Sequence, residues 1–127
     1  IGINLTDGGA LMAFRMRGRK DPARWSAATY RSTDGDTRTY PAEAVFFEVL
    51  RQWRSPRTAI EYPVKWRLRV GQRIFILQAL MDDQELDSRR STGVIYWEGA
   101  VRLLEDGHEI GRGYLEMTGY GEKIRLG

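Results

Sequence analysis

The chain has 127 residues, 42% of them hydrophobic and 11% aromatic, which is enough for one continuous core without metal or disulfide support. It contains no cysteine, which excludes a disulfide framework, a thiol nucleophile and a zinc–thiolate site. Its 20 lysines and arginines nearly balance 17 acidic residues, so charge alone does not indicate a nucleic acid partner.

Turn signals divide the chain into short segments that are rich in aromatic and β-branched residues, as is typical of strands. We predict about eight strands, at residues 1–5, 10–17, 25–31, 44–53, 60–70, 73–81, 93–104 and 110–120. Residues 41–49 are the one segment with a helical alternative, which Val45, Phe46 and Phe47 weaken. The strand that starts abruptly at Ile1 indicates a domain taken from a longer chain.

Residues 62–70 show the clearest alternation, with apolar side chains on one face and basic side chains on the other. Pro63 marks a bulge or an edge within this strand. Asp106 and Gly107 predict a two-residue hairpin between the last two long strands. Glycines inside predicted strands favour closure into a barrel, at Gly99, Gly111, Gly113 and Gly119. The predicted fold is a single all-β domain over residues 1–127, an antiparallel β-barrel.

Several motifs occur in an order that resembles one family. They are LTDGGALMAFRMR, WRSPRTAIEYPVKWRLRV, LMDDQELDSRRSTGVIYWEGAVRL and GRGYLEMTGY. Together they resemble the C-terminal lipocalin-like (calycin) domain of the AttH-like and carotenoid 1,2-hydratase (hydroxyneurosporene synthase) family. The resemblance implies a barrel that encloses a hydrophobic, lipid- or isoprenoid-like small molecule. It also implies an N-terminal barrel domain of the same protein as a partner.

In the hydratase branch, the resemblance implies cofactor-free addition of water to an isolated double bond. Such a reaction needs a shielded acid that protonates carbon, and aromatic faces that stabilise the cation. The Tyr-x-Asp element of these hydratases resembles Tyr96-Trp97-Glu98, with Glu in place of Asp and with Val64 where a histidine would accompany Trp66. The candidate catalytic residues are therefore Glu98, Glu116 and Tyr96, and Tyr114 is an alternative for orienting water.

Strand register decides whether Glu98 and Glu116 can act together. A simple two-residue turn would place them on opposite faces of the sheet, whereas a one-residue bulge near Gly111 or Gly113 would bring them side by side. We favour the bulge, and a pair of this kind raises one of the two pKa values. The structural alternative for Glu98 is a carboxylate held by the backbone or by an arginine such as Arg67 or Arg112.

Aromatic residues are the candidate ligand-binding set, because apolar pockets are lined mostly by such side chains. The set is Tyr62, Trp66, Trp97, Tyr114 and Tyr120, with Trp25 and Trp53 as further candidates. Core packing is the alternative for all of them, since a barrel of about eight strands can be filled by side chains. A third possibility is a structural domain that completes an inter-domain site, which predicts an exposed apolar patch.

Other polar residues carry weaker expectations. His108 follows the hairpin turn and is expected to be exposed, and a lone histidine without cysteine does not indicate a metal site. The acidic residues at 82–87 lack a calcium motif and are expected to pair with Arg89 and Arg90. The basic residues Arg15, Arg17, Lys65, Arg67 and Arg69 are expected on wet sheet faces. We expect no cofactor, no metal and no nucleic acid, and membrane association stays open.

Overall fold

The computed structural model describes residues 1–16 and 26–120. Ten strands form one antiparallel sheet. A single-turn 3-10 helix, η2 (Ala42–Ala44), lies between the fourth and the fifth strand. The strands are β1 (Gly2–Leu5), β2 (Ala10–Arg15), β3 (Ser26–Arg31), β4 (Thr37–Tyr40), β5 (Val45–Arg54), β6 (Glu61–Val70), β7 (Arg73–Ala79), β8 (Glu85–Ser88), β9 (Val94–Glu105) and β10 (His108–Met117). No helix among the described residues is long and apolar enough to cross a membrane.

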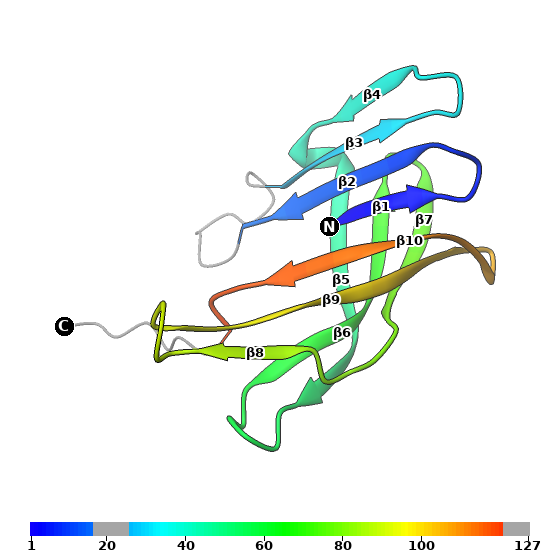
Figure 1. The fold of residues 1–127 in the computed structure, drawn as a ribbon. Coiled ribbons are helices and arrows are strands. Elements are labelled where there is room, and N and C mark those ends of the chain that lie inside the picture. Colours follow the sequence, from blue (N-terminus) through cyan, green and yellow to red (C-terminus); the bar gives the residue numbers. More distant parts are fainter. Residues whose placement is uncertain (17–25, 121–127) are drawn as a thin grey trace.

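The sheet curls strongly, so that β1, β2 and β10 face β5, β6 and β7 across the interior (Figure 1). Neighbouring strands follow the order β4-β3-β2-β1-β10-β9-β7-β6-β5, and β8 pairs with β9. The predicted all-β, antiparallel, lipocalin-like fold is therefore confirmed, in the form of a half-barrel. Closure is not complete, because β4 and β5 do not pair with each other in the described part of the chain.

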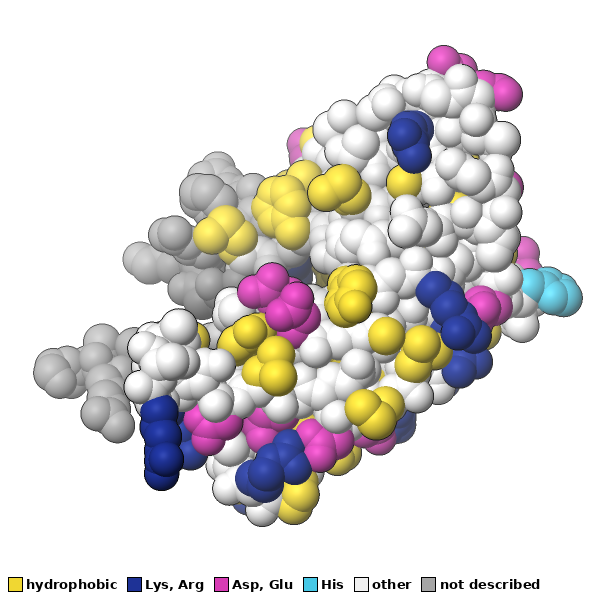
Figure 2. Space-filling view, viewed as in Figure 1, with side chains coloured by type: hydrophobic (Ala, Val, Ile, Leu, Met, Phe, Trp, Pro, Cys, Tyr) yellow, Lys and Arg dark blue, Asp and Glu magenta, His cyan; other side chains and the backbone are white. Residues whose placement is uncertain are grey.

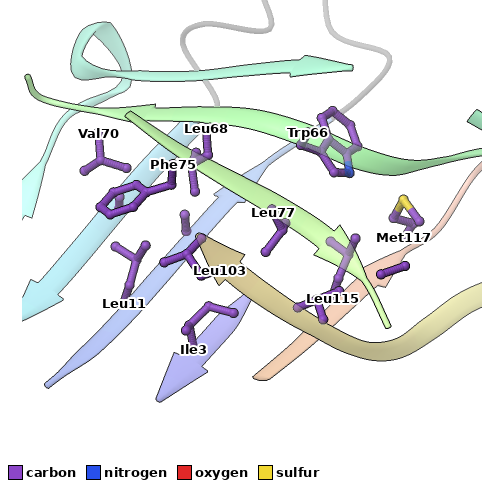
Figure 3. Packing of buried hydrophobic residues seen from close by; sticks show 14 of the residues in the cluster. Ile3, Leu11, Trp66, Leu68, Val70, Phe75, Leu77, Leu103, Leu115 and Met117 are labelled. Carbon is purple, nitrogen blue, oxygen red and sulfur yellow. The ribbon is translucent and has the colours of Figure 1, made fainter. Parts of the chain in front are cut away.

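The core fills the inner face of the curled sheet, with buried side chains from β1, β2, β6, β7, β9 and β10 (Figure 3). Its largest fully buried side chains are Trp97, Tyr62, Ile3, Leu11, Leu68, Leu77, Leu103, Val64 and Val101. Trp66 and Met117 lie at one end of this core, and Val70, Phe75 and Leu11 lie at the other (Figure 3). The predicted alternation of β6 is confirmed, because its even-numbered residues are buried while Arg67 and Arg69 are exposed.

The hairpin between β9 and β10 turns at Asp106 and Gly107, whose φ angles are 51° and 78°. Positive φ at both central residues is typical of a type I′ turn, and the predicted two-residue hairpin is confirmed. The register then shifts between Glu109 and Gly111, which is a β-bulge.

The bulge determines which residues of β10 face β9. Beyond it, Glu98 pairs directly with Glu116, and Gly99 pairs with Leu115. Paired residues of antiparallel strands point to the same side of the sheet, so the two carboxylates share one face. The favoured bulge is thus confirmed, and with it the juxtaposition of the two acids.

Four segments differ from the sequence prediction. The helical alternative at residues 41–49 reduces to η2, after which the β-branched and aromatic residues from Val45 onward form β5. The polar loop contains β8, which the prediction missed because this edge strand has an exposed side and few apolar residues. The short strand β4 was also missed, and Gly119 lies beyond the end of β10 rather than inside a strand.

Candidate functional site

Aromatic side chains gather on the inner face at the end of the half-barrel where Trp66 lies. Trp53 stacks on Tyr62 with ring centroids 6.2 Å apart, and Phe47 meets Trp66 edge to face at 5.8 Å. We call this cluster the aromatic end; it comprises Phe47, Trp53, Tyr62, Trp66, Trp97 and Tyr120. Four of the five predicted ligand-binding residues belong to it, and the structure brings them together from β6, β9 and the segment after β10.

Trp66 has an unsatisfied hydrogen-bond donor. The residue is 4% exposed, and its indole Nε1 has no hydrogen-bond partner among the described residues. The indole of Trp97, by contrast, donates to the carbonyl of Asp82 at 2.8 Å. Buried donors in folded proteins are nearly always paired, so the lone N–H of Trp66 requires an explanation.

Solvent reaches the inner side of the sheet beside the aromatic end, at the edge strand β5. Val49 pairs with Trp66 and therefore points to the inner side, yet it is 40% exposed. Register shifts between Val49 and Arg51 and between Arg51 and Gln52 bend this edge strand, and Leu50 in the first of them is 38% exposed. Pro63 lies opposite the second shift, which confirms the bulge that proline predicted.

Arg15 at the end of β2 covers the aromatic end from the opposite strand. Its Cζ lies 5.1 Å from the ring centroid of Trp66 and 5.6 Å from that of Phe47. Its Nη1 donates to the carbonyl of Phe47 at 3.2 Å, across the seam that backbone pairing leaves open. The expectation that Arg15 lies on a wet face is wrong, because it shares the inner side of β2 with Leu11 and Ala13.

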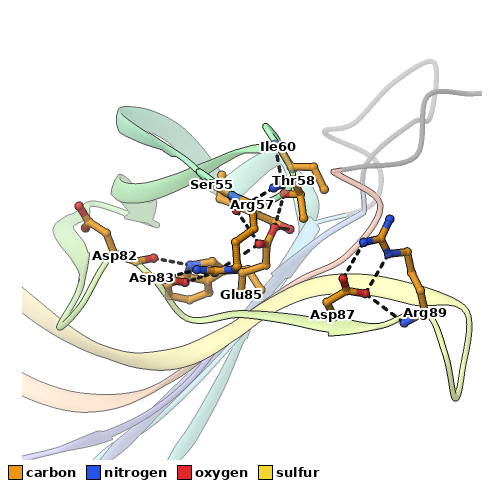
Figure 4. Close-up of polar contacts among 11 residues, drawn as sticks. Ser55, Arg57, Thr58, Ile60, Asp82, Asp83, Glu85, Asp87 and Arg89 are labelled. Atoms are coloured by element: carbon orange, nitrogen blue, oxygen red, sulfur yellow. Dashed lines mark hydrogen bonds and ion pairs between the residues drawn. The ribbon is translucent and has the colours of Figure 1, made fainter.

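A buried carboxylate anchors the loop between β5 and β6 to β8 (Figure 4). The side chain of Glu85 is 1% exposed and accepts hydrogen bonds from Ser55, Thr58 and Tyr62 at 2.6, 2.6 and 2.7 Å. Burial alone would raise the pKa of Glu85, but these bonds and the charge of Arg57 outweigh it and hold that pKa below its usual range. Three short motifs contact one another here: W-x-SP-x-T (53–58), YP (62–63) and DQEL (83–86). Their role at this place is structural.

Gln84 and Gly99 explain a further pair of motifs. The Gln84 side chain accepts from the N–H of Ala100 at 2.7 Å and donates to its carbonyl at 3.1 Å. The amide thus supplies hydrogen bonds to the backbone of β9 between the part that pairs with β7 and the part that pairs with β8. A Cβ on Gly99 would lie 2.0 Å from Oε1 of Gln84, so only glycine leaves room for this side chain.

The remaining acidic residues of this segment form surface ion pairs. Asp82 binds Arg51, and Asp83 binds Arg57, in both cases with two hydrogen bonds. Asp87 pairs with Arg89, as predicted (Figure 4). The expectation that the other acids pair with Arg89 and Arg90 is wrong, because the fold brings Arg51 and Arg57 next to them. No group of three or more potential metal ligands was found among the described residues.

The predicted catalytic pair lies outside the half-barrel. Glu98 and Glu116 pair across β9 and β10, but both side chains are exposed, so the expectation of a buried acid is wrong for this chain. Neither forms a side-chain hydrogen bond or ion pair with a described residue, since Arg67 pairs with Glu48 and Arg112 with Glu109. A catalytic role for the two acids stays a prediction.

Tyr96 and Tyr114 lie on the same outer face as the two acids. Each tyrosine precedes the acid of its own strand by two residues, and side chains two apart share a face. Tyr114 is 64% exposed, so its predicted place among the ligand-lining aromatics is wrong: strand alternation turns it away from the interior. His108 is exposed after the turn, as expected. Arg17 and Trp25 lie outside the described residues.

Exposed apolar side chains continue this outer face onto β2. Figure 2 shows apolar side chains beside acidic ones over β2, β9 and β10. We call the apolar part the outer patch; it comprises Met12, Phe14, Met16 and Tyr114. Gly2 of β1 pairs with both Met12 and Tyr114, so no side chain of β1 separates these two residues at that point of the outer face.

The fold and these contacts can be compared with known proteins. The model of the AttH-like family matches residues 1–120. The chain belongs to the AttH-like family. The crystal structure of an AttH homologue from Nitrosomonas europaea is similar to this AttH-like chain, with 49% sequence identity and a TM-score of 0.87, over 94% of the chain.

Kievitone hydratase from Nectria haematococca has the same fold, with a TM-score of 0.70 and 19% identity over 92% of the AttH-like chain. The AttH-like chain spans 37% of the length of each of these two structures. No curated protein matches it.

Sequence reasoning missed the inward position of Arg15 and the contributions of Phe47, Val49 and Glu85. Both faces of β2 carry apolar residues, so alternation did not assign Arg15 to a face. The bulges of β5 likewise hide which of its residues point inward. Parity with Leu11 is the signal that identifies Arg15 once the inner face is known.

Proposed function

We propose that this AttH-like domain binds a hydrophobic small molecule at the aromatic end. The observation that carries the proposal is the unpaired indole N–H of Trp66 beside inward-facing apolar residues that solvent reaches. Ligand sites are typically apolar and aromatic, with a few polar groups that orient the ligand. Stacked rings with one free donor fit that description, and a fully packed core would leave neither an unpaired donor nor exposed inward residues.

The test uses N-phenyl-1-naphthylamine, an uncharged apolar dye whose fluorescence rises on leaving water. We expect the chain to bind it, and Val49→Glu to weaken binding by about tenfold, or about 1.4 kcal/mol, because the carboxylate lies at the opening beside Trp66. Phe46→Glu is the matched control. Phe46 is exposed on the outer face of the same strand, so its replacement should leave the affinity unchanged.

Two results would reject the proposal. One is the absence of dye binding by a chain that is folded by circular dichroism. The other is an equal loss in both variants, which would place the dye on the outer face of β5 or attribute the effect to charge alone.

A second candidate rests on the outer patch. The structural alternative predicted an exposed apolar surface, and Met12, Phe14 and Tyr114 provide one. We propose that the rest of a longer protein, an N-terminal barrel, covers this patch. The chain spans only 37% of the N. europaea AttH homologue, which therefore has further chain that such a surface would fit.

The hydratase alternative depends on this second candidate. Protonating an alkene requires an acid that is shielded from water, whereas Glu98 and Glu116 are exposed in this chain. A domain that covered the outer patch would also reach the paired acids and would make this face one wall of an inter-domain site. The likeness to kievitone hydratase carries no activity to this chain, because 19% identity shows the fold alone.

A further inference from the structure

Arg15 is an inward-facing cation without a counter-charge. It occupies the inner side of β2 after Leu11 and Ala13, and it is half-buried. Its one hydrogen bond among the described residues is to the carbonyl of Phe47. No carboxylate of the described residues lies within 4 Å of it, although most other arginines on the strands of this sheet have one.

Arg73 shows what an internally balanced arginine looks like in the same fold. It also points inward, at the opposite end of the half-barrel, where it stacks on Tyr30 and Phe75. Glu105 binds it with two hydrogen bonds, of 2.9 and 2.7 Å. Arg15 has the same aromatic stacking but no acid, so most of the five N–H donors of its guanidinium stay available.

Two free donors therefore lie together at the aromatic end. The guanidinium of Arg15 is 5.1 Å from the centre of the Trp66 ring, and the Nε1–H of that ring is itself unpaired. Contacts with two nearly perpendicular rings and the bond to the Phe47 carbonyl hold the guanidinium in place, and Arg binds a carboxylate with two parallel hydrogen bonds. One anionic group that reached both the guanidinium of Arg15 and the indole N–H of Trp66 would satisfy both residues.

We infer that the hydrophobic ligand carries an anionic oxygen group, a carboxylate, which binds the guanidinium of Arg15 with the indole N–H of Trp66 as a second donor. The apolar body of the ligand then lies against Phe47 and Trp53. This inference rests on the proposed function and names the chemical class of its ligand. A charge-assisted pair is about twice as strong as a neutral hydrogen bond, so the acid should bind better than its uncharged derivatives.

The test compares cis-parinaric acid with its methyl ester, by their fluorescence on binding to the full chain at pH 7. We expect the acid to bind about tenfold more tightly than the ester. Arg15→Gln should remove this preference, so that the acid and the ester bind about equally tightly to the variant. Trp66→Phe keeps a ring but loses the donor, and it should reduce the preference in part.

Arg69→Gln is the matched control. Arg69 lies 5.4 Å from the ring centre of Phe46 and donates to the carbonyl of Gly71, but on the outer face of the sheet. This variant should keep the full preference for the acid. Arg15→Lys separates charge from geometry, because it should restore part of the preference that Arg15→Gln removes.

The outcomes separate the two proposals. If neither the acid nor the ester binds, and N-phenyl-1-naphthylamine does not bind either, the proposed function fails. If the ester binds but the acid binds no more tightly, or if Arg69→Gln acts like Arg15→Gln, the proposed function stands and the assignment of a carboxylate ligand is overturned.

Discussion

At the scale of single residues, the structure separates two kinds of carboxylate that look alike in the sequence. Glu85 comes from a polar loop and is buried in a network of hydroxyl donors, whereas Glu98 comes from an apolar run and is exposed. Tyr62 donates to Glu85, and burial together with this bond raises the pKa of the tyrosine hydroxyl. The buried acid of this domain is therefore structural.

Replacement of Glu85 should show how much this network contributes. We expect Glu85→Gln to lower the free energy of unfolding by about 3 kcal/mol at pH 7, because three hydroxyl donors and Arg57 lose a charged acceptor. Asp83→Asn, which affects the exposed side of the same arginine, should cost much less. Urea unfolding at equal pH measures both variants.

The charge of Glu85 also predicts how the stability of the chain depends on pH. The pKa of Glu85 lies below its usual 4.5 in the folded chain, so its stabilisation is present above the unfolded pKa and is lost as the pH falls through the folded value. The difference in stability between wild type and Glu85→Gln should be full at pH 7 and should shrink below about pH 4. A difference that does not change with pH would contradict the assigned charge.

At the level of elements, β9 passes from pairing with β7 to pairing with β8, and one side chain forms hydrogen bonds to β9 between the two. The Gln84 amide bonds to the backbone of Ala100. On β9, Ala100 lies between Val101, which pairs with the end of β7, and Trp97, which pairs with the start of β8. Gly99 leaves the space that this amide occupies. The motifs DQEL and YWEG are thus two halves of one local structure.

A double-mutant cycle tests that coupling. We expect Gly99→Ala to destabilise the chain by about 2 kcal/mol, because the new methyl group displaces the Gln84 amide and breaks its bonds to Ala100. In a Gln84→Ala background the same substitution should cost at least about 1 kcal/mol less. Additive effects, measured by thermal or urea unfolding, would show that Gly99 is required for another reason.

At the scale of the whole molecule, the curled sheet has two differently equipped faces. The inner face holds the core and the aromatic end, while the outer face carries the outer patch and the paired acids. The seam between β4 and β5 has no backbone pairing in the described residues, and side chains such as Arg15 bridge toward β5 instead. The proposed inner ligand site and the proposed outer docking surface are therefore separable by mutation.

The outer patch predicts self-association or dye binding of this chain by itself. We expect light scattering to show concentration-dependent association, and anilinonaphthalene sulfonate fluorescence to rise, with both effects reduced in a Phe14→Ser, Tyr114→Ser double variant. Ile74→Ser is the control, since Ile74 is exposed on the outer face of β7, away from the patch. A strictly monomeric chain that binds no dye would contradict the inter-domain role.

The strand-rich architecture, the two faces of β6, the β9–β10 hairpin and the family could all be predicted from the amino-acid sequence. All of these depend on local signals: alternation, a two-residue turn and motifs in a fixed order. The glycines of the last strand also indicated the bulge that pairs Glu98 with Glu116. The tertiary structure was needed to place this pair on the outer face, to turn Arg15 inward and to identify Glu85 as the buried acid. These features depend on the curl of the sheet and on contacts between segments far apart in the chain, which no local pattern records.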